Sequence, residues 1–412
     1  MKYITNLFNS LQKQKILKYI GPGLLVAVGF IDPGNWAANI AGGSQFGYNL
    51  LWVITAGTIV LIILQHNVAH LGIITGRCLA EEIYSRFNRK ISLFVLGSAL
   101  LANVSVILAE ILGVTIALNM LFNLDTKIGA IIAGVFSFLM VITNRYKKIE
   151  KIIIGFIAII GFSFIFELSL VDVSFEKSIF YSFVPNLPKN SHLIAMSMFG
   201  AIVMPHNLFL HSEIIQSRQW NTKDESVIKK QLQFEFIDTI FAMGLGWIIN
   251  AAMVLLSVSC FFYKNTIVTE LPQAHQLLIP LLGNKAALIF AIALFLAGFS
   301  SSMTAIMAAG TTSAGMFGEE YNVKSNKTLL GAFLCTFFAV VIIFFVKDIF
   351  KALIFSQAIL CFQIPFTIAS QLYLTSNKKI MGKYANSKFT NILIALIGII
   401  ITFFNIYLLF LS

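Results

Sequence analysis

Charged side chains are scarce in this sequence. Only 11% of its 412 residues are charged, whereas 58% are hydrophobic. A soluble globular domain does not require so large an apolar share, so that class is excluded. Apolar runs of about 20 residues recur from one end of the chain to the other, and each is long enough to cross a bilayer as a helix. The composition therefore predicts an all-α polytopic membrane protein surrounded by the lipid bilayer.

Cysteine is also rare, with four in the chain. Their positions fit neither the spacing of a metal-binding motif nor a disulfide framework. An ATP-binding loop of the G-x-x-x-x-G-K-[ST] type is missing, which argues against an ATP-driven pump. The sequence also lacks a convergent set of His and Glu motifs that would activate a water molecule. We therefore expect neither an enzyme nor a bound cofactor.

The net charge of +11 comes from lysines and arginines that lie between the apolar runs. They are not gathered on a soluble face, so nucleic acid is not expected as a partner. Five basic clusters fall on one side of the membrane, and the positive-inside rule then places the N-terminus in the cytoplasm and the C-terminus outside the plasma membrane. The whole chain, 1–412, is treated as a single, monomeric transmembrane domain. Its eleven predicted spans are 20–42, 49–73, 92–121, 127–144, 151–170, 192–216, 233–262, 277–312, 327–346, 350–374 and 389–411.

Two of the apolar runs are interrupted by proline and polar residues. The first run contains "GFIDPGNWAANI" at 29–40, and the sixth contains "MFGAIVMPHNLFLHS" at 198–212. Both interruptions read X-Pro-X-Asn, and five spans separate them. An odd separation gives the two halves opposite orientations, which is typical of inverted-repeat transporters whose broken helices meet at the bilayer midplane. The alternative is a pair of unrelated proline kinks.

The side chains at the two interruptions suit a particular class of ion. Asp32 offers a charged oxygen, Asn35 offers an amide oxygen, and the Ala201 carbonyl lies one turn before the second break. Met204 adds a soft thioether. Ca²⁺ and Mg²⁺ prefer shells made only of oxygen. The mixture instead favours Mn²⁺, Fe²⁺, Co²⁺, Zn²⁺ or Cd²⁺. Packing is the alternative interpretation of the methionine.

Several stretches resemble the Nramp (natural resistance-associated macrophage protein) family of divalent metal transporters. "GPGLLVAVGFIDPGNWAANIAGGSQFGYNLLW" is similar to the first-helix block of the family, and "LGIITGRCLAE" to its second cytoplasmic loop. "MPHNLFLHSEIIQSR" and "FSQAILCFQIPF" are similar to its sixth and tenth helices. The similarity covers about residues 18 to 375.

The resemblance carries expectations about fold and ligands. It implies a LeuT-like fold with two inverted five-helix repeats, 18–170 and 191–375, followed by an eleventh helix at 389–411. It implies that the divalent metal ion is bound by Asp32, Asn35, the Ala201 carbonyl and Met204. It further implies that Gln357 joins them in some conformations.

The chain departs from the family along the expected proton path. On the third span Glu110 is kept, but the aspartate one turn before it is Ile107. The inner of two arginines on the ninth span falls on Thr328, and Phe299 replaces a glutamine on the eighth. His206 remains and can exchange a proton near neutral pH. We therefore expect metal transport with weak, altered or absent proton coupling.

Three further polar residues are candidates for a role near the breaks, and two of them are open to two interpretations. Glu110 is either part of a proton path or a buried neutral acid. His211 has either a proton-path or supporting role, as its motif position implies, or a packing role. Asn207 could hold the broken backbone as a capping amide does.

The function expected from these features is secondary transport. The chain would import Mn²⁺ or Fe²⁺, and also Cd²⁺ or Co²⁺, by alternating access, as a symporter or a uniporter. A LeuT-like transporter of another cation or of a small organic substrate is the alternative. A metal channel is a further class, and it would conduct without saturating at low concentration. The residues do not rank Mn²⁺ against Fe²⁺, because their coordination shells are too alike.

Overall fold

The computed structural model describes residues 32–143, six isolated positions between 155 and 169, 171–216, 225–278, 283 and 286–411. The first half of the first predicted span and most of the fifth lie outside this part of the chain. Within it, every regular element is a helix. The longer helices are α3 (Pro33–Phe46), α4 (Leu51–Thr75), α6 (Arg89–Phe122), α7 (Thr126–Ile142), α10 (His192–Ile202), α11 (Pro205–Gln216), α12 (Glu225–Cys260), α14 (Ala286–Met316), α15 (Asn326–Ile343), α16 (Ile349–Ser376) and α18 (Lys388–Leu411).

Eight helical stretches of the described chain are long and apolar enough to cross a membrane. One of these, Pro33–Thr75, includes both α3 and α4, which a 3-10 turn at Gly47–Leu50 separates. The shorter apolar helix Thr126–Ile142 matches the fourth predicted span. The prediction of an all-α polytopic membrane protein is confirmed.

Polar side chains fix where several helices begin. The Asn88 side chain accepts a hydrogen bond from the backbone N–H of Ile91 at 2.9 Å, and α6 begins at Arg89, directly after Asn88. Ser325 caps α15 and Asp348 caps α16 in the same way. Such side chains satisfy backbone donors that have no partner within the first turn. The predicted starts at 327 and 350 are therefore one residue away from the observed ones.

Other boundaries were wrong. The predicted span 277–312 begins too early, because Leu271–Leu278 forms a 3-10 helix and α14 begins only at Ala286. The helix α12 begins at Glu225, eight residues before the predicted start. Its first turns are rich in charged residues, so hydropathy did not reveal them. Three short helices were not predicted, namely α5 (Leu79–Arg86), α9 (Phe175–Phe183) and α17 (Lys378–Met381).

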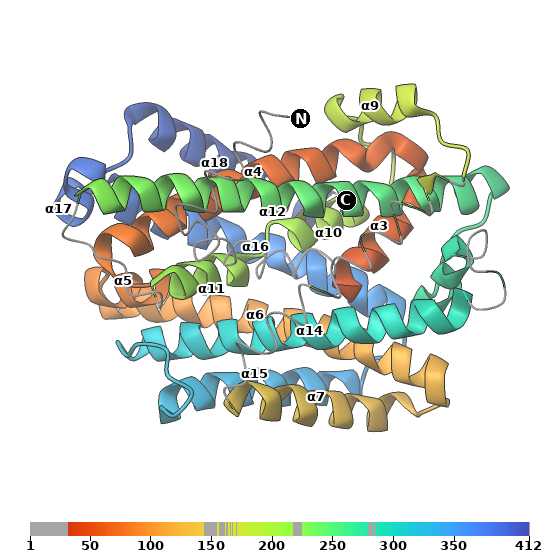
Figure 1. The fold of residues 1–412 in the computed structure, drawn as a ribbon, viewed down its shortest axis with the longest axis horizontal. Coiled ribbons are helices and arrows are strands. Elements are labelled where there is room, and N and C mark those ends of the chain that lie inside the picture. Colours follow the sequence, from red (N-terminus) through yellow and green to blue (C-terminus); the bar gives the residue numbers. More distant parts are fainter. Residues whose placement is uncertain are drawn as a thin grey trace, which may run out of the picture.

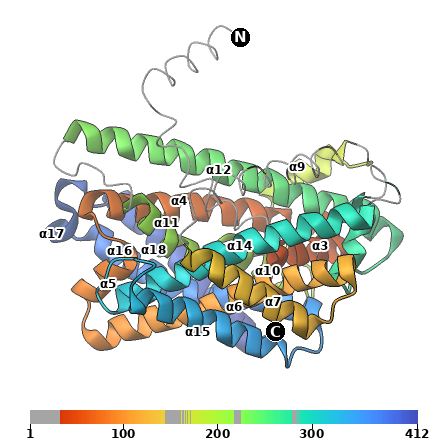
Figure 2. The same ribbon diagram turned by 60° about the horizontal axis from the view of Figure 1, so that its bottom comes forward.

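The broken helix pair lies inside the bundle. Figure 1 shows α10 and α11 in the middle of the molecule, with α12 and α4 on one side and α6 and α14 on the other. In the rotated view of Figure 2, α12 remains near the top and α15 near the bottom. The helix α3 packs against α10, α12 and α16. Trp36, fully buried on α3, contacts the rings of Phe164 and Phe290 at centroid distances of 5.4 and 5.2 Å. This packing fixes the start of α3 at the centre of the molecule.

Large apolar side chains cover part of the outer surface. Phe337 on α15 is 48% exposed, Ile131 on α7 is 47% exposed and Phe403 on α18 is 67% exposed. Apolar surface this extensive on a monomer marks a surface that contacts something other than water. These outer helices separate the central broken helices from the surroundings.

Candidate metal-binding site

The predicted first break falls at Asp32, the first residue that the structure describes, and the segment before it lies outside the described residues. Asp32 has extended backbone angles and is the N-cap of α3, with Pro33 at the first helical position. Its Oδ1 accepts a hydrogen bond from the backbone N–H of Asn35 at 2.5 Å. Proline has no backbone N–H. At the first helical position that N–H would have no partner within the helix, so no helical hydrogen bond is lost. Helix α3 thus starts in the interior, with a fully buried carboxylate at its positive end.

The second break separates α10 from α11. Helix α10 ends at Ile202, and Val203 and Met204 lie between it and Pro205, the first residue of α11. The Asn207 side chain donates from Nδ2 to the Met204 sulfur at 3.5 Å, and its backbone N–H donates to the Met204 carbonyl at 3.1 Å. Asn207 therefore contacts this break with its backbone N–H and with its side chain. The side chain contacts the thioether of Met204 and so orients it.

The two breaks meet directly. Asn35 Nδ2 donates to the Ala201 carbonyl at 2.9 Å and to Asp32 Oδ2 at 3.1 Å. Ala201 is 166 residues away in the chain, in the last turn of α10. One turn beyond it lies Met204, which is 1% exposed. A carboxylate, an amide and a backbone carbonyl are therefore joined in one buried group, with the thioether on the adjoining segment.

Gln357 of α16 lies against both breaks. A Cβ atom on Gly34 would overlap the Gln357 side chain, and a Cβ on Gly200 would overlap the Gln357 carbonyl. The two glycines are therefore needed for α16 to approach α3 and α10. Gln357 is fully buried, and its Oε1 has no hydrogen-bond partner among the described residues. A buried acceptor without a partner costs about 1–3 kcal/mol, so a ligand that satisfies it would be favoured.

Two more polar atoms near the second break are also buried without a hydrogen-bond partner among the described residues. Asn207 Oδ1 and His206 Nδ1 are buried and find no partner in the part of the chain that the structure describes. His206 itself is 2% exposed. Oxygen and sulfur donors thus lie at the two interruptions, and a buried imidazole nitrogen lies in the first turn of α11. Such a mixed donor set suits borderline transition-metal ions better than Ca²⁺ or Mg²⁺.

Glu110 lies next to the first break. Its carboxylate accepts a short hydrogen bond from Ser301 Oγ of α14, and it is close enough to Asp32 for the two acids to interact electrostatically. One turn further along α6, Gly113 leaves room for the Pro33 ring, which a Cβ there would overlap. Of the three replacements along the expected proton path, Ile107 and Thr328 are buried, at 0% and 2% exposure, and Phe299 is partly buried.

His211 belongs to a separate polar cluster that the sequence did not reveal. Its Nε2 lies 3.4 Å from Glu235 Oε1 on α12, and the other oxygen of Glu235 lies 2.6 Å from His66 Nδ1 on α4. Thr239 also donates to Glu235, at 2.7 Å. His211 is fully buried, whereas the His66 side chain is 34% exposed. The three residues come from three helices, so no spacing in the sequence could have joined them.

Cys78 and Glu81, at the short helix α5, have buried side chains outside the spans. Glu81 Oε2 accepts a hydrogen bond from the backbone N–H of Cys78 at 2.6 Å, as the third helical residue of a capping box does. Burial raises the pKa of the Glu81 carboxyl above its usual value, although that hydrogen bond opposes the shift. Burial also raises the pKa of the Cys78 thiol well above its usual value.

A comparison with known proteins identifies a matching family and relatives of similar sequence. The sequence model of the family described as natural resistance-associated macrophage protein-like matches residues 23–411. A divalent metal cation transporter MntH of Caldanaerobacter subterraneus is 38% identical over 99% of this chain and 96% of its own length. A divalent metal cation transporter MntH of Listeria innocua is 35% identical over 96% of this chain and 90% of its own length.

Solved structures resemble the fold. A mutant of the manganese transporter of Eremococcus coleocola superposes with a TM-score of 0.78 at 26% identity, covering 95% of this chain and 86% of that one. Mhp1, a nucleobase-cation-symport-1 family transporter with the LeuT-like fold, gives a TM-score of 0.63 at 15% identity. It covers 93% of this chain and 90% of that one. At this identity, the second likeness concerns the fold alone.

Proposed function

Because the chain belongs to the Nramp family of divalent metal transporters, we propose that it imports a divalent transition-metal ion, Mn²⁺ or Fe²⁺ and also Cd²⁺ or Co²⁺. The observation that carries this proposal is the hydrogen bond from Asn35 to the Ala201 carbonyl, since it joins the two helix breaks. The ion would bind there to Asp32, Asn35, the Ala201 carbonyl and Met204. Gln357, whose Oε1 lacks a protein partner among the described residues, would complete the shell.

The chemistry of these donors supports a weak and selective site. One carboxylate among neutral ligands gives less electrostatic attraction than the several carboxylates of a tight calcium site. A bound cargo ion can therefore be released. The thioether adds little to Mn²⁺ affinity, but Ca²⁺ or Mg²⁺ would lose a hydration oxygen without receiving a hard ligand in exchange.

The transport cycle that we propose is alternating access. Helices that break at an ion site leave short segments free to move separately. The break between α10 and α11 is spanned by two residues, Val203 and Met204. The proposed repeats are 18–170 and 191–375, with the eleventh helix 389–411 outside them. The proposed setting is the plasma membrane, with a monomeric chain, a cytoplasmic N-terminus and an external C-terminus, as its basic clusters favour.

We propose that proton coupling is weak, altered or absent. Ile107 lies one turn before Glu110, and an alkyl side chain neither binds nor passes on a proton. Thr328 contributes its hydroxyl to a hydrogen bond from the backbone N–H of Asn322 at 3.3 Å and carries no ionisable group. A proton that reached Glu110 would thus lack the ionisable steps beyond it that the family has at these two positions.

Uptake into liposomes tests both parts of the proposal. The purified chain would be reconstituted, Mn²⁺ uptake would be measured against Ca²⁺ and Mg²⁺ in competition, and the internal pH would be recorded in the same vesicles. We expect saturable Mn²⁺ uptake that Ca²⁺ and Mg²⁺ do not inhibit, with little response to an imposed pH gradient. Inhibition by an organic substrate or Na⁺ instead would favour the alternative class of transporter. Strict co-movement of protons with Mn²⁺ would contradict the coupling proposal alone.

A further inference from the structure

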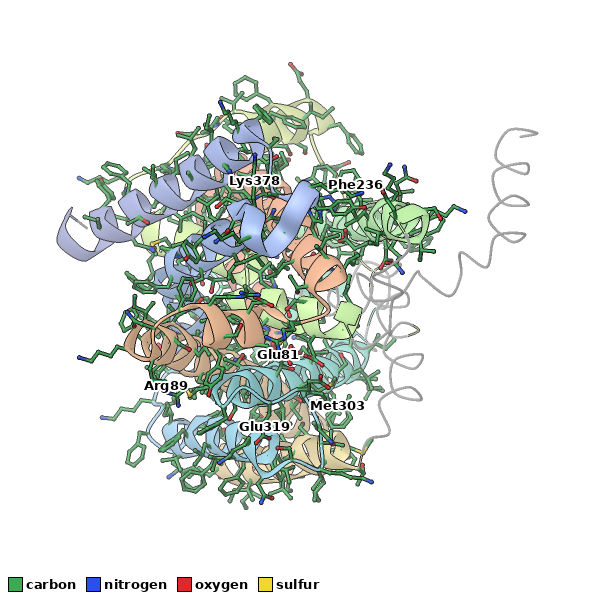
Figure 3. The ribbon with its side chains drawn as sticks, turned by 90° about the vertical axis from the view of Figure 1, so that its left-hand side faces the viewer. Glu81, Arg89, Phe236, Met303, Glu319 and Lys378 are labelled. Atoms are coloured by element: carbon green, nitrogen blue, oxygen red, sulfur yellow. The ribbon has the colours of Figure 1, made fainter. Side chains whose placement is uncertain are left out.

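A second group of metal-ligating side chains lies away from the helix breaks. Cys78, Glu81 and Glu213 each offer one ligand atom, and these atoms all lie within 4.8 Å of one another. The three residues are 1%, 7% and 6% exposed. Figure 3 looks onto the end of the bundle that contains α5, and Glu81 lies near the middle of this end. Glu213 is eight residues beyond Pro205 on α11, about 12 Å along the helix axis.

The local structure holds these ligands in place before any ion binds. Glu81 Oε2 is tied to the Cys78 backbone N–H, which fixes its position in the first turn of α5. The backbone N–H of Leu79 donates to Ser212 Oγ at 3.0 Å, so the start of α5 is joined to the residue next to Glu213. A cation would therefore find two of its ligands on one element and the third on another, with the distance between them already set.

The protein balances the charges of the two carboxyl groups only in part, since Arg77 acts electrostatically on Glu81 and the Cys78 side chain is hydrogen-bonded to Glu213. Glu213 Oε2 is buried and has no hydrogen-bond partner among the described residues. The residue as a whole is more than nine-tenths buried. In the same part of the chain, neither Glu81 nor Glu213 forms an ion pair with a lysine or arginine. Glu320 lies close enough to act electrostatically on both. A carboxylate that is buried without an ion-pair partner is costly, and a bound divalent cation would lower this cost.

An acidic hollow lies near this cluster, because Glu320, which acts electrostatically on Glu81 and Glu213, also lines it. Glu320 lines a cavity of about 570 Å³ together with Glu319, Tyr321 and Asn322, on the connection between α14 and α15. This cavity is large enough for a hydrated ion and carries acidic groups at its wall. Its acidic wall would raise the local concentration of cations near the cluster.

We propose that Cys78, Glu81 and Glu213 form a second divalent-metal site, which takes Zn²⁺, Cd²⁺ or Co²⁺ through one thiolate and two carboxylates. A thiolate selects softer ions than the thioether of Met204 does, so Mn²⁺ is disfavoured here. Three protein ligands leave a fourth position for water, as in zinc sites that exchange their ligand. Binding releases the thiol proton to solvent, because the thiolate is the ligand form. The site is independent of the proposed transport site and would tie α11 to α5.

Cadmium binding by the full-length chain in detergent tests this proposal. A Cd²⁺–thiolate bond gives an ultraviolet charge-transfer band, which a bond to carboxylate or thioether does not mimic. The band would be titrated with Cd²⁺, and the bound metal counted by equilibrium dialysis, in the wild type and in Asp32→Asn. We expect one Cd²⁺ per chain to produce the band, and we expect the band to persist in Asp32→Asn. Displacement by Zn²⁺ but not by equal Mn²⁺ is also expected.

Three variants decide the assignment. Cys78→Ser is expected to lose the band, Glu213→Gln to weaken the titration at least tenfold, and the matched control Cys260→Ser to leave it unchanged. No band in the wild type at saturating Cd²⁺ would overturn the proposal, as would a band that survives Cys78→Ser. If Cys78→Ser does not fold, Glu213→Gln decides alone, and an unchanged titration would overturn the proposal. A failure of Mn²⁺ uptake with the band intact would count against the transport proposal only.

Discussion

Gly113 on α6 allows a sharp test of how the first break is held. A methyl group at this position would overlap the Pro33 ring, directly beside Asp32. Overpacking of a buried contact costs about 1–3 kcal/mol. The change to alanine also improves helix propensity by about 1 kcal/mol, which would partly hide the strain. Gly97→Ala on the same helix provides the control, because a methyl there would meet only Met316 Cε at 3.9 Å.

The difference between the two variants isolates the strain, since the propensity gain is common to both. Relative to Gly97→Ala, Gly113→Ala should therefore lose about 1–3 kcal/mol in total. This loss is divided between the free energy of unfolding and the free energy of Mn²⁺ binding. If all of it displaced Pro33 and Asp32, Mn²⁺ affinity would fall by roughly 5- to 150-fold. Isothermal titration with Mn²⁺ and thermal unfolding in the same detergent measure the two shares. Equal values for both variants in both assays would refute the contact between α6 and the first break.

Three further outcomes are expected. Met204→Ala should reduce discrimination against Ca²⁺ more than it reduces Mn²⁺ uptake, and full exclusion of Ca²⁺ by this variant in a competition assay would refute the role of the sulfur. Asn35→Ala leaves the Ala201 carbonyl without its 2.9 Å donor, so stability should fall by about 1–3 kcal/mol in thermal unfolding and Mn²⁺ binding should weaken. Cys78 should react with a maleimide far more slowly than Cys260 at pH 7 and faster as the pH rises, because burial raises its thiol pKa; equal rates at pH 7 would contradict its burial.

Much of the helical layout follows from hydropathy. The predicted span 350–374 lies within the observed α16, Ile349–Ser376, and 327–346 overlaps α15, Asn326–Ile343. Both helices have a polar cap beside an apolar run, so two signals coincide. The span 277–312 was wrong because an apolar segment continues on both sides of the change from 3-10 helix to α14. Hydrophobicity alone does not mark such a boundary.

The second helix break and the start of α3 at Asp32 were predictable for a physical reason. Proline and a polar side chain in the middle of an apolar run leave backbone groups without partners, and this cost points to a site. Matching of the two X-Pro-X-Asn motifs then suggested that Asn35 and Ala201 meet, and they are hydrogen-bonded. The roles of these residues as metal ligands stay a prediction.

The polar clusters built from distant residues were not predictable. Glu235 joins His66 and His211 from three helices, and neither its spacing nor its neighbours in the chain indicate this. The spacing of the cysteines likewise gave no sign that Cys78 lies beside two carboxyl groups. Its two carboxylate neighbours come from α5 and α11, and only the packing of these helices brings them within 4.8 Å.

Anomalous X-ray scattering from Mn²⁺ tests the central claim most directly. Crystals of the chain would be soaked in Mn²⁺ and the metal located from its own signal, with Asp32→Asn crystals as the control. A single strong peak is expected between the Asp32 carboxylate, the Ala201 carbonyl and the Met204 sulfur, and it should disappear in the variant. A peak that lies elsewhere, or one that persists without the carboxylate, would show that the two broken helices do not build the ion site.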